Sequence, residues 1–89
     1  SMQEVHQYGR SLLAQKKSKE AFNVFKMNYD KFPNVFTTNT GMARAYSGIG
    51  DYKKALEYAQ KALPQAPESQ NKANLERMIK LLQDGKDIN

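Results

Sequence analysis

The side chains that most often perform catalysis do not assemble into a recognisable set in this sequence. His6 is the only histidine and the chain has no cysteine, whereas a zinc site needs three or four ligands at suitable spacing. No serine stands in a sharp turn that would let it form a nucleophilic triad with His6. The acidic residues lie apart among lysines and do not converge as the paired carboxylates of a glycosidase do. We therefore predict no enzyme activity, no metal and no cofactor, and we expect His6 to be exposed on a helix.

The segment SGIGDY at 47–52 contains a Gly-x-Gly pattern, but it does not have the form of a phosphate-binding loop. It follows a predicted helix and lacks both the third glycine and the lysine of such loops, so we interpret it as a helix break. Tyrosines interleaved with lysines can stack on the bases of single-stranded nucleic acid. Here Tyr8 and Tyr46 are better explained by packing and Tyr52 by the turn, so the sequence does not favour nucleic acid as a partner.

Length and charge set wide limits on the partner. A chain of 89 residues forms one small domain at most, and no apolar run approaches the roughly 20 residues that a membrane span requires. The net charge of +5 is compatible with an acidic protein surface or nucleic acid as partner. It is equally compatible with an ordinary lysine-rich surface in contact with solvent.

The sequence repeats itself at an interval of 34 residues, the period of stacked helix–turn–helix units. Apolar residues recur in steps of three, one and three, as they do on one face of an α-helix, and no segment shows sustained alternation. The predicted fold class is therefore all-α. The aligned pairs are Gly9 with Ala43, Leu12 with Tyr46, Ala21 with Ala55, Phe22 with Leu56, and Pro33 with Pro67.

Prolines, glycines and caps divide the chain into five predicted helices within a single domain, residues 1–89. We expect Ser18 to cap the second helix and Asp51 the fourth, and Pro33 to end the second. The predicted helices cover residues 3–15, 18–32, 36–47, 52–63 and about 70–84, with a tail at 85–89. The first two helices form one unit (2–35), the next two a second unit (36–69), and the last is a single capping helix.

Small residues should let the paired helices approach each other closely. Helices that cross at about 8–10 Å leave no room for a large side chain on each partner. We expect Gly9 to face Ala21 in the first unit, and Ala43 to face Ala55 in the second. Tyr8 and other large residues should fill the interior around them.

These residues resemble the tetratricopeptide repeat family. The second unit carries Ala43, Tyr46, the Gly-Asp-Tyr turn at 50–52, Ala55, Ala62 and Pro67 at the positions of the motif. The first unit keeps Gly9, Ala21, Phe25 and Pro33, but it has Lys16-Lys17-Ser18 in place of the turn, and neither unit has the motif's tryptophan. The resemblance implies a short α–α superhelix of two such units plus a C-terminal capping helix.

A second likeness concerns the phrase GMARAYSGIGDYKKALEYAQKAL and the lysine-rich ending GKDIN. They resemble the C-terminal repeat segment of an uncharacterised family of exported bacterial proteins, in which the repeats follow a β-rich domain. This likeness implies that the chain is a fragment of a larger protein located in the bacterial cell envelope.

In stacked helix pairs, the first helix of each unit lines a concave groove. The candidate peptide-binding residues in this groove are His6, Arg10, Thr40, Arg44, Ser47, Arg77 and Lys80. By helical phase, Arg10, Arg44 and Lys80 occupy equivalent positions and form a basic line. Because guanidinium groups hold carboxylates in a bidentate manner, an extended acidic peptide would suit this line. The same charges are also explained as ordinary solvated helix charge.

The resemblance also allows a comparison with the family's carboxylate clamp, which binds chaperone tails. Of the clamp positions only Arg77 agrees, while His6, Arg10, Gly41 and Ala73 depart from it. A chaperone-tail adaptor is therefore disfavoured.

Two functions remain open from the sequence. The first is a non-catalytic protein–protein interaction module that binds an extended, acidic peptide or protein segment in its groove. The second is a structural docking or oligomerisation module that packs against its own upstream domain or against a second copy through its helix ends, where Met2 and Val5 would otherwise lack a cover.

Overall fold

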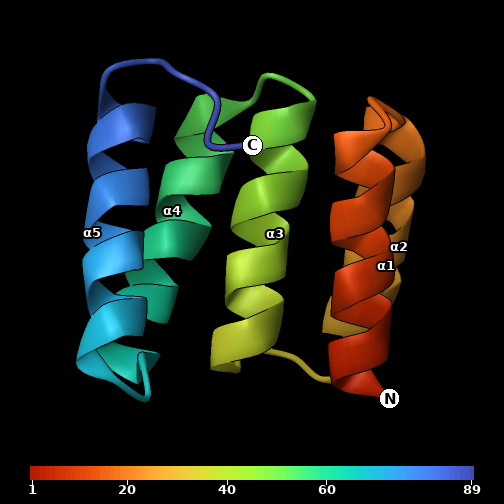
Figure 1. Cartoon of the computed structure of the whole chain (residues 1–89), viewed down its shortest axis with the longest axis horizontal. Coiled ribbons are helices and arrows are strands. Elements are labelled where there is room, and N and C mark those ends of the chain that lie inside the picture. Colours follow the sequence, from red (N-terminus) through yellow and green to blue (C-terminus); the bar gives the residue numbers. More distant parts are fainter.

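The computed structural model describes all 89 residues as helices joined by short turns, without a strand (Figure 1). The helices are α1 (Met2–Ala14), α2 (Ser18–Lys31), α3 (Phe36–Gly48), α4 (Tyr52–Ala62) and α5 (Ser69–Gln83), with a short 3-10 turn η1 (Leu63–Gln65) after α4. Each helix packs against the next one in the chain, and α1 also packs against α3. The predicted all-α class and the five helices are confirmed, and their ends agree to about one residue. None of the helices combines the length and apolarity needed to cross a bilayer.

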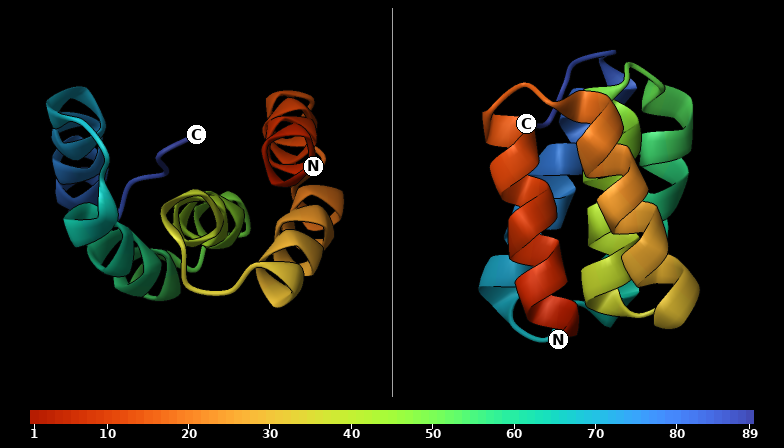
Figure 2. Two further views of the ribbon diagram at one scale, coloured as in Figure 1. Left: turned by 90° about the horizontal axis from the view of Figure 1, so that it is seen from below. Right: turned by 90° about the vertical axis from the view of Figure 1, so that its right-hand side faces the viewer.

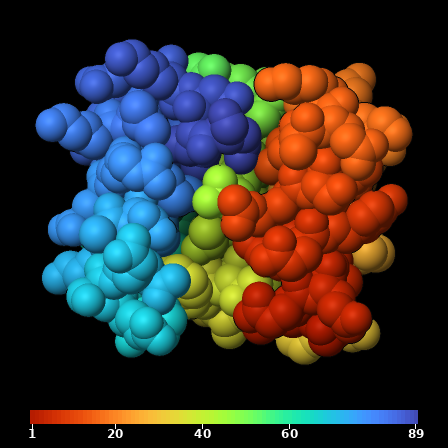
Figure 3. Space-filling model, in the orientation of Figure 1, coloured from red at the N-terminus to blue at the C-terminus, as the bar shows by residue number.

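The five helices form a curved row. Seen along the helix axes in the left view of Figure 2, α1, α3 and α5 lie on the inner side of the curve, and α2 and α4 lie on its outer side. The inner side is hollowed between α1 and α5 and has α3 as its floor (Figure 3). We call this hollow the groove. The residues after α5 turn back towards α3 and enter it (Figure 2).

α3 is the central helix and joins two apolar clusters. One cluster consists of Ala43, Ala55, Ala59, Ala62, Leu75, Met78 and Leu82. The other consists of Leu12, Leu13, Ala21, Phe25, Met42 and Ala45. α3 contributes to both, and its Tyr46 packs against both. Because no residue of α3 is fully exposed, the side chains that it presents to solvent are largely those on the floor of the groove.

A phenylalanine ring sets the spacing of α1, α2 and α3. Phe25 of α2 is 1% exposed, and its ring lies against Gly9 of α1 and Gly41 of α3. A Cβ atom on Gly9 would stand 2.7–2.8 Å from three ring carbons, and one on Gly41 would stand 2.7 Å from another. Ala21, the expected partner of Gly9, is fully buried, but the Phe25 ring is the group closest to Gly9. The two glycines are therefore required by the ring between them.

The turns inside the two units differ in their chemistry. In the second unit, Gly50 has φ +84° and the Asp51 side chain accepts a hydrogen bond from the Lys54 amide at 3.1 Å, so the predicted cap is confirmed. In the first unit, Lys16 takes the same left-handed conformation with φ 63°, which costs about 1 kcal/mol for a residue with a Cβ. The prediction that Ser18 caps α2 is wrong, since α2 starts at Ser18 and Lys17 precedes it without a side-chain cap.

The prediction that Tyr8 fills the interior is also wrong. Its side chain is 57% exposed, whereas the buried residues of α1 are His6, Gly9, Leu12 and Leu13. The helix is rotated so that Gly9 meets Phe25, and this rotation turns Tyr8 outwards. The large aromatic side chain that packs in the interior beside Gly9 is Phe25 of α2.

We predict that Gly9→Ala destabilises the domain although alanine is the better helix former. The helix gains about 1 kcal/mol from the substitution, but the new methyl group overlaps a buried ring that Gly41 holds from the other side. Overpacking of this kind costs about 1–3 kcal/mol, so we expect a net loss of about 1 kcal/mol and a midpoint of thermal unfolding lowered by about 4–8 °C. Circular dichroism melting measures this change.

Gly48→Ala is the matched control. The atom nearest to a Cβ there would be Cδ2 of Leu13, at 2.7 Å, which is the end of a flexible side chain, whereas Asn89 and Ser18 would lie at ordinary contact distances of 3.7 and 3.8 Å. The gain in helix propensity should therefore persist. Phe25→Leu should lower the free energy of unfolding less in the Gly9→Ala background than in the wild type, because the smaller side chain removes the overlap with the new methyl group. Equal stabilities of Gly9→Ala and Gly48→Ala would contradict the role given to the ring.

Candidate functional site: an arginine-lined groove

The groove contains two cavities, one at each end. The first, which we call the arginine pocket, has a volume of about 360 Å³. It is lined by Arg10, Leu13, Ala14, Lys16, Ser18, Arg44, Gly48, Arg77, Met78, Asp87, Ile88 and Asn89. The second, the polar pocket, has a volume of about 420 Å³. It is lined by Gln3, His6, Gln7, Phe36, Thr37, Thr40, Gln65, Pro67 and Asn71.

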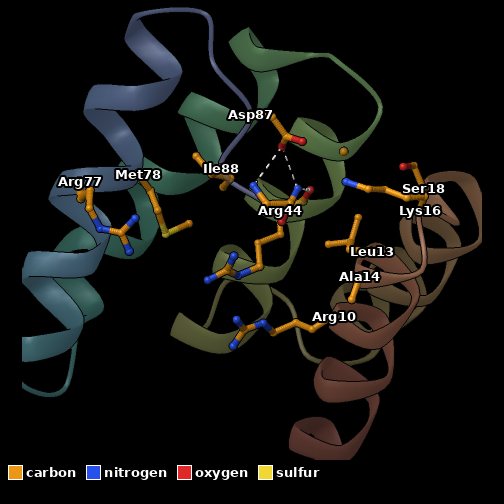
Figure 4. Close-up of a pocket in the computed structure, with 12 residues that line it drawn as sticks. Arg10, Leu13, Ala14, Lys16, Ser18, Arg44, Arg77, Met78, Asp87 and Ile88 are labelled. Atoms are coloured by element: carbon orange, nitrogen blue, oxygen red, sulfur yellow. Dashed lines mark hydrogen bonds between the residues drawn. The ribbon is translucent and has the colours of Figure 1, made fainter.

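Three helices each contribute one arginine to the arginine pocket. Arg10 comes from α1, Arg44 from α3 and Arg77 from α5, and Figure 4 shows their guanidinium groups directed into the same space. The basic line was expected to run through Arg10, Arg44 and Lys80. Lys80 lines neither cavity, whereas Arg77, one turn earlier on α5, lines the pocket with the other two. The structure thus brings together three of the predicted binding residues and leaves Lys80 outside.

No carboxylate neutralises these arginines. The two ion pairs in the structure join the amino terminus to Glu4 and Lys26 to Asp30, both on exposed surfaces. Arg44 is half-buried, and its burial together with the charges of Arg10 and Arg77 lowers its pKa to about 10. Arg44 therefore remains charged at neutral pH while it lies close to two like charges. An anion placed between the three guanidinium groups would relieve this repulsion.

The prediction that His6 is exposed is wrong. Only 8% of the residue is exposed, and its ring packs edge-on against Phe25 with the centroids 5.5 Å apart. Burial, followed by the charges of Arg44 and Arg10, lowers the pKa of His6 to about 4. His6 is therefore neutral at pH 7 and a weak base. The same glycines that admit the Phe25 ring bring His6 inwards, because His6 and Gly9 lie on one face of α1.

Unpaired polar atoms gather along the groove. His6 Nδ1, Thr40 Oγ1 and Arg44 Nε are buried and have no hydrogen-bond partner within the protein. His6 and Thr40 line the polar pocket, and Arg44 lines the arginine pocket. A buried polar atom without a partner costs about 1–3 kcal/mol. These three atoms therefore lower the stability of the folded domain at its groove.

The residues after α5 occupy part of the groove, which the sequence did not predict. Asp87 accepts a hydrogen bond from the Ser47 hydroxyl, and the same hydroxyl accepts one from the Ile88 amide at 3.0 Å. The Asn89 side-chain amide donates to the Arg44 carbonyl at 2.9 Å and to Asp87 at 3.0 Å. Ile88 is partly buried against the cluster that contains Ala43. Of the predicted tail at 85–89, residues 86–89 include the groups that make these contacts, and below we call them alone the tail.

Ser47 was predicted to contact a ligand in the groove. It is 1% exposed, and its hydroxyl is already used by the tail as both donor and acceptor. This contact was difficult to predict from the sequence, because the tail has no helical period and its position depends on the Ser47 hydroxyl and on one apolar contact of Ile88. The only indication in the sequence that this segment contacts the domain is the apolar Ile88 next to the polar Asp87.

The polar pocket is built mainly from side chains that can form hydrogen bonds. Gln3 on α1 donates to the Thr37 hydroxyl on α3 at 3.0 Å and so links the two walls of this end. Thr40 lies one turn further along α3, with its hydroxyl unpaired. No group of three or more histidine, cysteine, aspartate or glutamate side chains comes together as a metal site would require.

We predict that burial of His6 makes the domain less stable in mild acid. Between pH 6.5 and pH 4 the unfolded chain binds a proton at His6 that the folded chain does not, so stability falls as the pH is lowered through this range. The loss amounts to at most about 3 kcal/mol. NMR titration of the single imidazole should give a midpoint near 4, and thermal unfolding of His6→Gln should depend less on pH than that of the wild type. A midpoint near 6.5 would contradict the buried position.

No protein-family model matches this chain, and no curated protein is significantly similar to it. The structure itself identifies a small all-helical domain of five helices that pack in sequence order. Its function has to be inferred from the chemistry of the groove.

Proposed function

We propose that this chain is a non-catalytic protein–protein interaction module that binds an extended, acidic segment of another protein in the groove between α1 and α5. In this proposal the four helices α1–α4 are two helix–turn–helix units of the tetratricopeptide type, and α5 caps the open end of the stack. The two units present α1 and α3 to the ligand, with α5 as the third wall.

One observation carries the proposal: the groove already holds a non-helical stretch of chain. Residues 86–89 lie in it without regular secondary structure. Three groups of these residues contact the groove. The Asp87 carboxylate and the Ile88 amide form hydrogen bonds with Ser47, and the Ile88 side chain packs against the apolar cluster that contains Ala43. These are the three kinds of contact by which grooves recognise extended peptides. The tail supports a mode of binding in which a partner segment lies along the groove as an extended chain.

The charge of the groove favours an acidic partner. Four cationic side chains and one carboxylate line the arginine pocket, and that carboxylate, Asp87, is engaged with Ser47 and Asn89 rather than with an arginine. The charge of the arginines therefore remains available to a ligand. Long-range attraction to an acidic segment would also raise its rate of association.

Binding is a better proposal than catalysis for the same residues. A general base works best with a pKa near the operating pH, whereas the pKa of His6 is lowered to about 4. Its ring also packs on Phe25, with no carboxylate to orient it. A neutral His6 in the wall of the polar pocket can instead serve as a hydrogen-bond partner for a peptide.

We predict that a peptide library displayed against the immobilised domain yields sequences rich in aspartate and glutamate. Binding of the best peptide, measured by fluorescence anisotropy, should weaken at least about tenfold in Arg10→Glu/Arg77→Glu, since two charged hydrogen bonds are lost and replaced by repulsion. Both arginines are exposed, so the fold should persist, which circular dichroism verifies.

The matched control is Lys53→Glu/Lys54→Glu, which makes the same change of charge on the exposed surface of α4, outside both cavities. It should bind the peptide nearly as well as the wild type. Enrichment of sequences without acidic residues, or equal weakening by both double variants, would count against the groove.

A second function is favoured by the apolar surface at the α1–α2 end of the row. Met27 is 60% exposed and Phe32 is 38% exposed, and with Val5 they line a shallow cavity of about 170 Å³. Exposed apolar patches of this kind mark sites of association. In this alternative the domain docks through this end onto an upstream domain of its own protein or onto a second copy.

Sedimentation velocity over a range of concentrations tests the second copy. If this end forms a homodimer, Met27→Lys/Phe32→Lys should convert the dimer to a monomer, because two charges would be buried in an apolar contact. The groove variant Arg10→Glu/Arg77→Glu should leave the dimer intact. A wild-type monomer at the highest concentration reached would exclude self-association through this surface.

A further inference from the structure

Three guanidinium groups line the arginine pocket, and none of them forms an ion pair within the protein. Arg10, Arg44 and Arg77 come from three different helices, so their meeting is a property of the fold and not of a charged stretch of sequence. The side chains that line the cavity of about 360 Å³, with Lys16 and Asp87 included, carry a net formal charge of +3. Figure 4 shows the three arginine side chains pointing towards the same space.

Arg44 is the strongest indication of a specific ligand. It is half-buried on the floor of the groove, its Nε has no hydrogen-bond partner within the protein, and the charges that act on it most strongly are those of the two other arginines. Charged groups in such positions are usually paired. The half-buried position of Arg44 on the floor of the groove therefore differs from that of an ordinary solvent-exposed charge.

The number of donors exceeds what one carboxylate can use. Each guanidinium offers five N–H donors in a planar fork, whereas a carboxylate carries a single negative charge and two oxygens. A phosphate monoester carries a charge of about −1.5 to −2 at neutral pH and has three strong acceptor oxygens. Three forks from three directions therefore match a phosphate group better than they match the side chain of aspartate or glutamate.

We propose that Arg10, Arg44 and Arg77 form a binding site for a phosphate monoester. The proposal rests on the groove function and deepens it: the segment bound in the groove would carry the phosphate on a side chain, with the flanking residues along α1 and α3. A small phosphorylated molecule has the same chemistry, and the experiment separates the two sources.

The tail lies beside this site without filling it. The hydrogen bonds of Asp87 go to Ser47 and Asn89, and no ion pair links Asp87 to an arginine. The arginines therefore accept a phosphate while the tail stays in place. A longer ligand would displace residues 86–89 from the groove. The displacement would be recognised by the loss of the contact between Ile88 and the apolar cluster that contains Ala43.

The test uses the 89-residue chain and isothermal titration calorimetry at constant ionic strength. The probes are phenyl phosphate, acetate and malonate, the last of which also carries two negative charges. Phenyl phosphate should bind at least about tenfold more tightly than malonate, and its binding should weaken several-fold between pH 7.5 and pH 5, as the phosphate gains a proton with a pKa of about 6. Malonate binding as tightly as phenyl phosphate would overturn the proposal.

Three variants assign the binding to the arginines. Arg10→Gln and Arg77→Gln, both at exposed positions, should each weaken phenyl phosphate binding about tenfold. Arg44→Lys keeps the charge but loses the fork, and it should weaken binding while preserving the fold. Lys53→Gln on α4 is the control for net charge and should leave binding unchanged. Equal losses in Lys53→Gln and Arg10→Gln would indicate non-specific charge attraction and overturn the site.

A peptide with one phosphoserine, compared with the same peptide carrying glutamate, distinguishes the two sources. Tighter binding of the phosphopeptide than of phenyl phosphate would assign the phosphate to a protein partner, and equal binding would assign it to a small molecule. The proposed function and this inference fail separately. Acidic peptides that bind through the arginines without any preference for phosphate would retain the groove and exclude the phosphate site.

Discussion

The contact of the Phe25 ring with Gly9 and Gly41 is the constraint on which the rest of the structure depends. Helices α1 and α3 have no side chain at these two points, so a single ring from α2 fills the space between them and fixes their separation. This separation places His6 and Arg10 on one wall of the groove and Thr40 and Arg44 on its floor. Glycine lowers the intrinsic stability of both helices by about 1 kcal/mol each, and burial of a complete phenylalanine side chain offsets that cost. The groove is therefore a consequence of how the interior is packed.

An aromatic cluster on the outer side keeps the two units in register. Tyr46 of α3 stacks on Tyr58 of α4 with centroids 5.6 Å apart, and it meets Phe22 of α2 edge-on at 5.0 Å. Tyr29 of α2 also meets Tyr58 edge-on at 5.6 Å. Each such pair contributes about 0.5–1.5 kcal/mol beyond the burial of its area. Because these rings join α2, α3 and α4, they determine the position of the two units relative to each other. The inner side does not need apolar contacts for this purpose and can therefore carry charged side chains.

The helices were predictable because local signals decide where they begin and end. Pro33 ends α2 and Gly50 with Asp51 separates α3 from α4, and these residues act through their own backbone conformation whatever surrounds them. The rotation of α1 was not predictable, because it depends on the partner of Gly9, which lies on another helix. For the same reason Tyr8 was placed inside and His6 outside. In the candidate site, Arg77 lines the pocket and Lys80 does not, because the rotation of α5 depends on its packing against α4. The position of the tail could not be predicted, because no periodic pattern marks it.

Several unfavourable interactions of this domain lie on its inner side. The arginines repel one another, burial keeps His6 neutral, and the Thr40 hydroxyl lacks a hydrogen-bond partner. Each of these costs could be removed by an ordinary substitution without a change of fold. Proteins commonly carry such costs where a ligand relieves them. A ligand that neutralises the arginines would bind the folded state alone and would stabilise it in proportion to its affinity. The repulsion between the arginines lowers the free energy of unfolding of the ligand-free domain. Relief of that repulsion by a ligand would then contribute to the free energy of binding.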